Sequence, residues 1–167
     1  GHKMAAGLSM QEKDIDTLRS RLCENCVLEE ADFEPRVHID IAMPLSYVSK
    51  ELVEELELLE PFGVGNTKPV FAQKNVLLTK GMLLGKSGRA IKFKVRDDMG
   101  QQKDMLYFGD VEELLTFLRQ LHGEKLVDAL LKEGNVSLPL TITYYPDINE
   151  YRGVKTIQII MTNYSKS

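Results

Sequence analysis

The sequence predicts a fold of mostly β class with helices (α+β), in which five strands form a small barrel. A helical insert separates the third strand from the fourth, and a helical connector precedes the barrel. The evidence is a change of pattern along the chain. Apolar residues recur at helical spacing up to residue 60, alternate with polar residues after residue 69, and return to helical spacing between residues 110 and 133. The 167 residues, 43% of them hydrophobic, suffice for the core of one ordinary domain.

The first predicted helix covers residues 9 to 28. Ser9 and Glu12 have the spacing of a capping box at its start. Apolar side chains recur on one face of this helix: Ile15, Leu18, Leu22 and Cys26. Residues 29 to 38 are polar and predict a connector, and residues 39 to 45 predict a short extended piece.

Two cysteines, Cys23 and Cys26, lie near the end of this helix. Their spacing suits a redox pair or half of a metal site, but two cysteines alone cannot complete a four-ligand zinc site. We favour the packing of two small side chains at the helix end, because an unpaired cysteine often behaves as a small buried hydrophobe. Neither cysteine is assigned a functional role.

A second helix is predicted over residues 49 to 60, with an apolar stripe opposite an acidic face. The acidic residues are Glu51, Glu54, Glu55, Glu57 and Glu60. Such a run suits a metal ion or a basic partner, but we favour a solvated face that also repels phosphates. Pro61 ends the helix, and the glycines of residues 61 to 66 predict a turn.

Two strands are predicted at residues 70 to 85 and 89 to 97, joined by the hairpin linker Gly85-Lys86-Ser87-Gly88. The second strand alternates between apolar and basic side chains. Its apolar set is Ile91, Phe93 and Val95, and its basic set is Lys92, Lys94 and Arg96. Because successive side chains of a strand point to opposite faces, one face belongs to the core and the other carries three cations.

The remaining elements are a turn, a short strand, two helical stretches and two strands. The turn is predicted at residues 97 to 102 and the third strand at residues 105 to 108. Asp110 with Glu113 opens the helical insert, which runs to about residue 133. The last two strands are predicted at residues 137 to 145 and 154 to 163, separated by a polar loop at residues 146 to 153.

This order of elements is that of the five-stranded OB barrel. The usual ligand face of an OB barrel is formed by its second and third strands, with the loops that join strands one to two and four to five. A five-stranded sheet packed on helices in another topology is the alternative that element order leaves open.

The charge of the chain is unevenly distributed. A net charge of −4 argues against a nucleic-acid binder if the charges are evenly spread. Residues 1–68, however, hold 7 basic and 14 acidic residues, net −7, whereas residues 69–167 hold 14 basic and 11 acidic residues, net +3. Residues 74 to 96 contain seven Lys or Arg and no Asp or Glu. Apolar residues are threaded through this segment, so it predicts a folded basic surface and not a disordered tail.

These charges and the aromatic residues near them predict binding of single-stranded nucleic acid with little sequence preference, since cations track phosphates and aromatic rings stack on any base. The candidate residues are Lys86, Arg89, Lys92, Lys94, Arg96, Tyr107 or Phe108, Tyr145, Tyr151 and Arg152. The alternative interpretation is that strand lysines only prevent edge-to-edge aggregation and that the tyrosines are half-buried cross-strand partners.

The sequence predicts neither a catalytic site nor a metal site in this chain. The spacings of His38 with Asp40, Asp14 with Asp16, and Asp97 with Asp98 are interpreted as surface features. A signal peptide and an apolar run of about 18 residues, which a membrane-spanning helix needs, are both missing. A cytoplasmic protein without membrane contact is therefore expected.

Three stretches of the chain carry a resemblance to a known family. Residues 1 to 9, GHKMAAGLS, are similar to the Gly-Gly-His-x-x-Ala-Ala-Gly signature near the end of the DHH-associated domain. Residues 51 to 72 resemble a segment that leads into an OB domain, and residues 148 to 160 resemble an Asn-Glu-aromatic-x-Gly pattern at its last two strands. Together they resemble the C-terminal part of the RecJ family, single-stranded-DNA-specific 5′→3′ exonucleases of the DHH phosphoesterase superfamily.

The resemblance implies a piece of a longer, metal-dependent nuclease. The motifs that bind manganese or magnesium in the family have no counterpart here, so this chain alone is expected to be inactive and to hold no cofactor. The implied domains are a remnant of the DHH-associated domain at residues 1–33, a connector with the acidic helix at 34–68, and the barrel at 69–167. His2 is implied as a remnant of the substrate-phosphate site, and Asn149 joins the nucleic-acid-binding candidates.

The implied partners are single-stranded DNA and the missing DHH catalytic core in cis, with repair or replication proteins as further candidates. The expected function is to grip a single strand and guide it to the nuclease core in DNA repair and recombination. The alternative is a protein-interaction barrel that docks repair or replication partners without binding nucleic acid.

Overall fold

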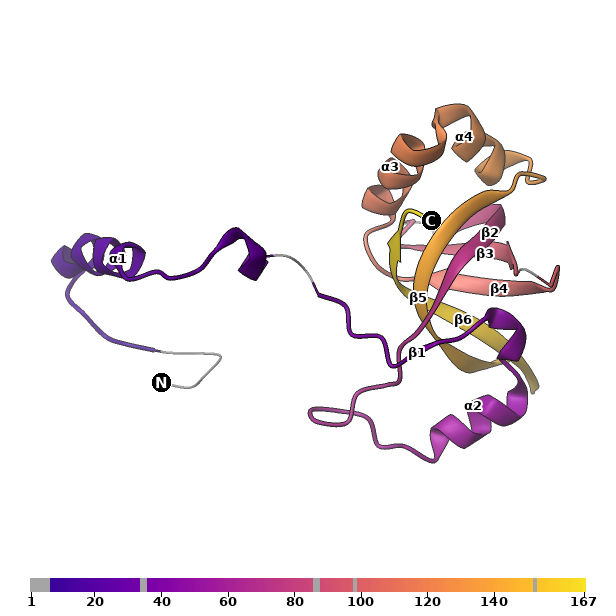
Figure 1. The fold of residues 1–167 in the computed structure, drawn as a ribbon, viewed down its shortest axis with the longest axis horizontal. Helices are drawn as coiled ribbons and strands as arrows, with labels where there is room; N and C mark the ends of the chain where they lie inside the picture. The colour runs from indigo at the N-terminus through magenta and orange to yellow at the C-terminus, as the bar shows by residue number, and fades with distance from the viewer. Residues whose placement is uncertain (1–6, 34–35, 86–87, 98, 152) are drawn as a thin grey trace. The chain divides into compact units, whose positions relative to one another are not determined.

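The computed structural model describes residues 7–33, 36–85, 88–97, 99–151 and 153–167, with the side chains of Ala31 and Tyr151 left out. Contacts within the chain divide it into two compact units, Gly1–Arg36 and Val37–Ser167 (Figure 1). None of the described helices combines the length and the apolar content that crossing a bilayer requires.

The first unit contains a short 3-10 turn, η1 (Glu12–Asp14), the helix α1 (Ile15–Glu24) and a second 3-10 turn, η2 (Glu30–Phe33). The helix is shorter than the predicted span of residues 9 to 28, and no described residue of it is buried. Cys23 and Cys26 are both exposed, so the predicted packing of these two side chains is wrong within this unit. A helix without a buried face lacks the tertiary packing that would lengthen it.

The second unit is a closed barrel. Its strands are β2 (Phe71–Leu84), β3 (Ala90–Arg96), β4 (Gln102–Tyr107), β5 (Leu138–Tyr151) and β6 (Val154–Ser165). They are ordered β2-β3-β4-β6-β5, and β5 pairs back with β2. The β4–β6 pair is parallel and the other barrel pairs are antiparallel. The predicted OB barrel is confirmed by this order, and the alternative sheet topology is excluded.

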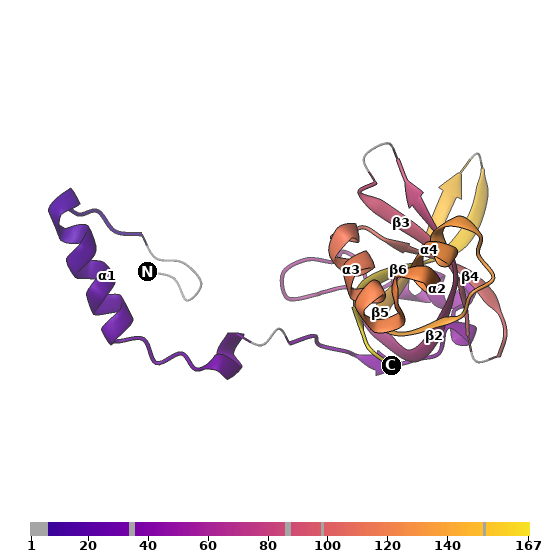
Figure 2. The same ribbon diagram turned by 90° about the horizontal axis from the view of Figure 1, so that it is seen from above.

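A helical pair covers one end of the barrel, as Figure 2 shows from above. Its helices, α3 (Val111–His122) and α4 (Glu124–Lys132), form the predicted insert between β4 and β5. The carboxylate of Asp110 accepts a hydrogen bond from the Glu113 amide at 2.9 Å, as the capping prediction requires. The pair contributes fully buried side chains to the core: Leu114, Leu118, Val127 and Leu130.

The glycine at position 81 in β2 allows α4 to approach the barrel closely. A Cβ atom there would lie 3.1 Å from the Leu131 side chain of α4 and 3.2 Å from the Phe93 ring. Both distances are shorter than most side chains tolerate, so the helix and the ring pack directly against the strand backbone.

The opposite end of the barrel is covered by residues 41 to 57, which hold β1 (Ile41–Ala42), η3 (Leu45–Tyr47) and α2 (Lys50–Glu57) (Figure 1). Tyr144 donates its hydroxyl hydrogen to the Met43 carbonyl at 2.8 Å, which ties this segment to β5. The Ser49 hydroxyl accepts from the Leu52 amide at 3.2 Å and caps α2. The acidic helix therefore belongs to the same compact unit as the barrel.

Two strands of the barrel are longer than predicted, in both cases because polar residues predict loop. The predicted loop at residues 146 to 153 is mostly strand, since β5 continues to Tyr151 and pairs with β6 throughout. Likewise β4 begins at Gln102, which pairs with Arg96 of β3. Polar side chains are stable in such strands because some of them, Gln102, Asn149 and Glu150, are exposed to solvent and pairing satisfies the backbone groups.

Asp97 is predicted to be a surface residue but is only 3% exposed. Its carboxylate oxygen accepts hydrogen bonds from the Met99 amide at 3.0 Å and the Gln101 amide at 2.9 Å. Asp97 therefore organises the turn between β3 and β4, which is a frequent use of Asp in turns.

Candidate nucleic-acid interface

The outward side chains of β2 and β3 form a basic surface, which we call the cationic face: Lys80, Lys92, Lys94 and Arg96. Lys80 lies directly opposite Lys94 across the two strands. The alternate residues of β3 are completely buried, namely Ile91, Phe93 and Val95. The predicted division of β3 into a core face and a basic face is confirmed.

A groove of about 410 Å³ runs along part of the cationic face. One wall comes from the barrel and includes Lys80, Lys94 and Arg96. The other wall is the segment that follows α4, residues 133 to 137. Left-handed backbone at Gly134 (φ +74°) and Asn135 (φ +62°) turns this segment alongside the barrel. The helical insert thus extends the groove, a point on which the sequence was uninformative.

Asp104 of β4 is an acid within the cationic face. Its carboxylate lies 2.5 Å from the ammonium groups of both Lys92 and Lys94. Burial opposes ionisation of this carboxyl, but the hydrogen bonds and charges of the two lysines outweigh burial and lower the pKa of Asp104. Among the described residues, Lys80 and Arg96 take part in no ion pair.

We expect Asp104→Asn to destabilise the barrel at neutral pH and to lose that effect in acid. A carboxyl whose pKa is lower in the folded state stabilises that state above its unfolded pKa, about 3.9, and stops doing so as the pH falls through the folded value. The loss at pH 7 should be about 1 kcal/mol or less, since the pair is partly exposed. Urea unfolding of both proteins at pH 7 and pH 2.5 measures this difference. A difference that stays constant over this range would contradict it.

Tyr107 is predicted to be a base-stacking residue, but it is only 8% exposed. Its ring packs edge-on against Tyr164, with centroids 5.8 Å apart and planes at 80°. Tyr107 lies opposite Ile91 and shares the buried side of the sheet, so its ring has no free face for a base. The other aromatic residue considered at this position, Phe108, is 62% exposed.

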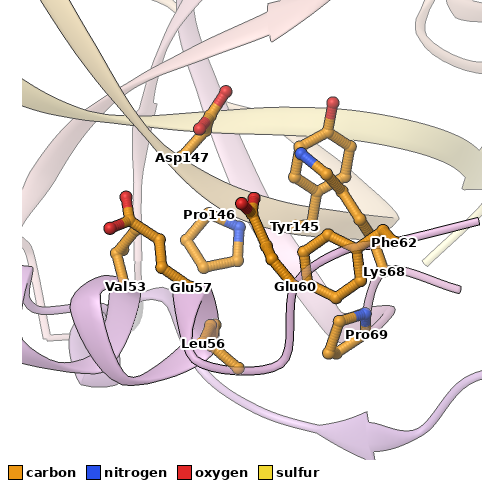
Figure 3. Close-up of a pocket in the computed structure, with 10 residues that line it drawn as sticks. All are labelled: Val53, Leu56, Glu57, Glu60, Phe62, Lys68, Pro69, Tyr145, Pro146 and Asp147. Atoms are coloured by element: carbon orange, nitrogen blue, oxygen red, sulfur yellow. The ribbon is translucent and has the colours of Figure 1, made fainter. Parts of the chain in front are cut away.

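Tyr145 is half-buried in a pocket beside α2 (Figure 3) and does not line the groove of the cationic face. The Lys68 ammonium sits 4.6 Å from the centroid of its ring. Asn149 is exposed on β5 opposite Thr156, and Arg89 is exposed just before β3. The other predicted site residues lie outside the described residues or side chains: His2, Lys86, Tyr151 and Arg152.

Sequence reasoning missed Asp104 and did not assign Lys80 or the wall at residues 133 to 137. The position of Asp104 was predictable in principle. A turn at residues 97 to 101 folds β4 back on β3 and places Asp104 opposite Lys94. In the part of the chain that the structure describes, no three His, Cys, Asp or Glu side chains are grouped so as to hold a metal ion. The described residues therefore do not fit a metal centre.

Comparisons with known proteins identify the family. The family described as RecJ OB domain matches residues 39–163. The single-stranded-DNA-specific exonuclease RecJ of Bacillus subtilis is 33% identical over 103 residues, which are 60% of this chain and 13% of that relative.

Two crystal structures of RecJ from Thermus thermophilus have a similar fold. The Mn²⁺ complex is 21% identical, with a TM-score of 0.65 over 100% of this chain and 21% of its own. The Mg²⁺ complex is 17% identical, with a TM-score of 0.60 over 95% of this chain and 21% of its own. This chain spans only a small part of the length of these proteins. The match over residues 39–163, on a barrel with OB strand order, shows that the chain belongs to the RecJ OB domain family.

Proposed function

We propose that this chain is the single-stranded-DNA-binding module of a RecJ-type exonuclease and that its cationic face holds the phosphates of the strand. The observation that carries the proposal is the groove, in which Lys80, Lys94 and Arg96 share one wall. The name of the Bacillus subtilis relative, a single-stranded-DNA-specific exonuclease, supports a single strand as the ligand.

Each part of the face has a separate task in this proposal. Lys80 and Arg96, which make no ion pair among the described residues, bind phosphates first. Lys92 and Lys94 then release the carboxylate of Asp104 and bind a phosphate of the DNA in its place. Phe108 offers an exposed ring on which a base can stack, and the exposed side chains of Arg89 and Asn149 are further contacts. Phosphate contacts and stacking give little sequence preference.

Hydrolysis of the strand belongs, in this proposal, to a DHH catalytic core that lies elsewhere in the longer protein. The RecJ crystal structures are described with Mn²⁺ or Mg²⁺, whereas the described residues of this chain group no set of metal ligands. Such a metal would activate water and stabilise charge on phosphorus. This chain would grip and guide the strand during DNA repair and recombination in the cytoplasm, without activity of its own.

A salt titration tests the proposal. Fluorescence anisotropy of a labelled oligothymidylate should rise on addition of the chain at 20 mM salt and rise less as salt increases. Two to four phosphate contacts predict a log–log slope of about −1.4 to −2.8, since each contact on a single strand contributes about −0.7. A duplex of the same length serves as the control and should bind more weakly. No binding at 20 mM salt would favour a barrel that binds proteins only.

A further inference from the structure

A second pocket lies between α2, the segment at residues 60 to 69, and β5, as Figure 3 shows. Its volume is about 50 Å³, far below the roughly 300–1,000 Å³ of typical small-molecule sites. Val53, which is 3% exposed, and Leu56 give it an apolar side. The size and the apolar side suit the end of one side chain with an aliphatic stem. We call this site the acidic–aromatic pocket.

The pocket carries an excess of negative charge. Three carboxylates line it, from Glu57, Glu60 and Asp147, against one basic residue, Lys68. Within the described residues, none of the three carboxylates takes part in an ion pair. Phosphates are repelled from such a surface, so the pocket does not continue the DNA-binding face.

The aromatic walls of the pocket already hold a cation. The Lys68 ammonium lies 4.6 Å from the centroid of the Tyr145 ring and 5.7 Å from that of Phe62. Both distances are within the roughly 6 Å of a cation–π contact. Lys68 is exposed and reaches the rings by its long stem, so it can leave them at little cost. The Lys68 ammonium therefore occupies the position over the rings that a cationic ligand would take.

Two simpler occupants fit less well. A metal ion is disfavoured because the described residues include no three carboxylate, histidine or cysteine side chains grouped for one ion. Water alone is disfavoured because the aromatic rings and the apolar side of the pocket offer it no hydrogen-bond partner. An arginine side chain matches every part, because its planar head stacks on aromatic rings, pairs with carboxylates and is weakly hydrated.

We propose that the acidic–aromatic pocket binds an arginine side chain from an exposed basic segment of a partner protein. The guanidinium replaces Lys68 over Tyr145 and Phe62 and faces the carboxylates of Glu57 and Glu60. The aliphatic stem of the arginine lies along the apolar side formed by Val53 and Leu56. This interaction is independent of DNA binding by the cationic face.

The test is an NMR titration of the ¹⁵N-labelled chain with the peptide acetyl-Gly-Arg-Gly-amide. We expect saturable shifts of the Tyr145 and Asp147 amides. The same peptide with citrulline is the matched control, since it keeps the shape of arginine without its charge, and it should cause no saturable shift. Equal shifts with both peptides would overturn the proposal.

Variants of the pocket sharpen this test. Glu57→Gln with Glu60→Gln should weaken arginine binding about two- to thirtyfold, since two exposed charge pairs of about 0.2–1 kcal/mol each are lost. Glu55→Gln, on the same helix but outside the pocket, should leave binding unchanged. Lys68→Ala should tighten binding about two- to fivefold by removing the internal competitor. An unchanged affinity in the Glu57 and Glu60 double variant would contradict the proposal.

A parallel titration with oligothymidylate separates this proposal from the DNA-binding one. Oligothymidylate should shift the amide signals of β3 and leave the amide signal of Asp147 unchanged. The Glu57 and Glu60 double variant should bind oligothymidylate as tightly as the unchanged chain does. Saturable shifts of Asp147 by oligothymidylate would make the pocket part of the DNA site and overturn the arginine proposal. Absence of DNA binding would count against the proposed function only, because the peptide titration does not depend on it.

Discussion

Replacing Lys94 and Arg96 by glutamate is expected to weaken binding of single-stranded DNA about 100-fold or more at low salt. Both side chains line the groove, and hydrogen bonds to charged groups contribute about 1.5–3 kcal/mol each. Charge reversal removes two phosphate contacts and adds repulsion beside Asp104. The salt slope should also become shallower by about 0.7 for each phosphate that is no longer bound. Anisotropy titrations of both proteins measure the two effects together.

A matched control separates the groove from the overall charge of the molecule. Lys125 of α4 and Lys166 near the C-terminus are exposed and do not line the groove. Changing both to glutamate alters the net charge by the same amount, and binding should fall by less than about threefold, because neither side chain lines the groove and salt screens exposed charges that make no direct contact. An equal loss in the control would show that total charge, and not the groove, governs binding.

Phe93→Ala is expected to cost about 3–5 kcal/mol of folding free energy, the range for truncating a buried phenylalanine. The ring is completely buried. Phe93 lies opposite Gly81 of β2 and Met105 of β4, and α4 packs against β2 at Gly81. Since single domains have about 5–15 kcal/mol of stability, much of it would be lost. Urea unfolding followed by circular dichroism measures the change.

The control for this variant is Phe108→Ala, which truncates the same residue type where it is 62% exposed. Its cost should be within about 0.5 kcal/mol, as for most surface changes. In the proposed function it should instead weaken DNA binding, because stacking contributes about 1–3 kcal/mol per base. A loss for Phe93→Ala as small as the loss expected for Phe108→Ala would show that Phe93 is not central to the core.

Features fixed by local pattern were predictable from the sequence. The alternation of β3 places Phe93 inward and Lys94 outward without knowledge of any partner strand. The cap of α3 at Asp110 depends on residues within one helical turn. The order of these elements was sufficient to identify the barrel, because few topologies accommodate three strands, a helix and two strands.

Features that depend on pairing between distant segments were not predictable in this way. The choice between Tyr107 and Phe108 turned on strand register, since a shift of one residue exchanges the buried and exposed aromatic rings. The ion pairs of Asp104 require β4 to lie beside β3 in one register. The contact of Lys68 with Tyr145 joins the loop before β2 to β5, which lies more than 60 residues later in the chain. The charge pattern located the basic strand but contained no information on these contacts.

The pairing of β2 with β5 also bears on how quickly the molecule can form. Phe71 lies opposite Tyr144, and two strands and both helices of the insert come between them in the chain. Pairing β2 with β5 closes a long loop, so it costs conformational entropy and occurs late in folding. Barrels dominated by such long-range pairings fold over about milliseconds to seconds. The wall at residues 133 to 137 leads directly into β5, so the groove exists only after closure. A chain still emerging from the ribosome therefore carries the lysines of β2 and β3 well before the groove beside them exists.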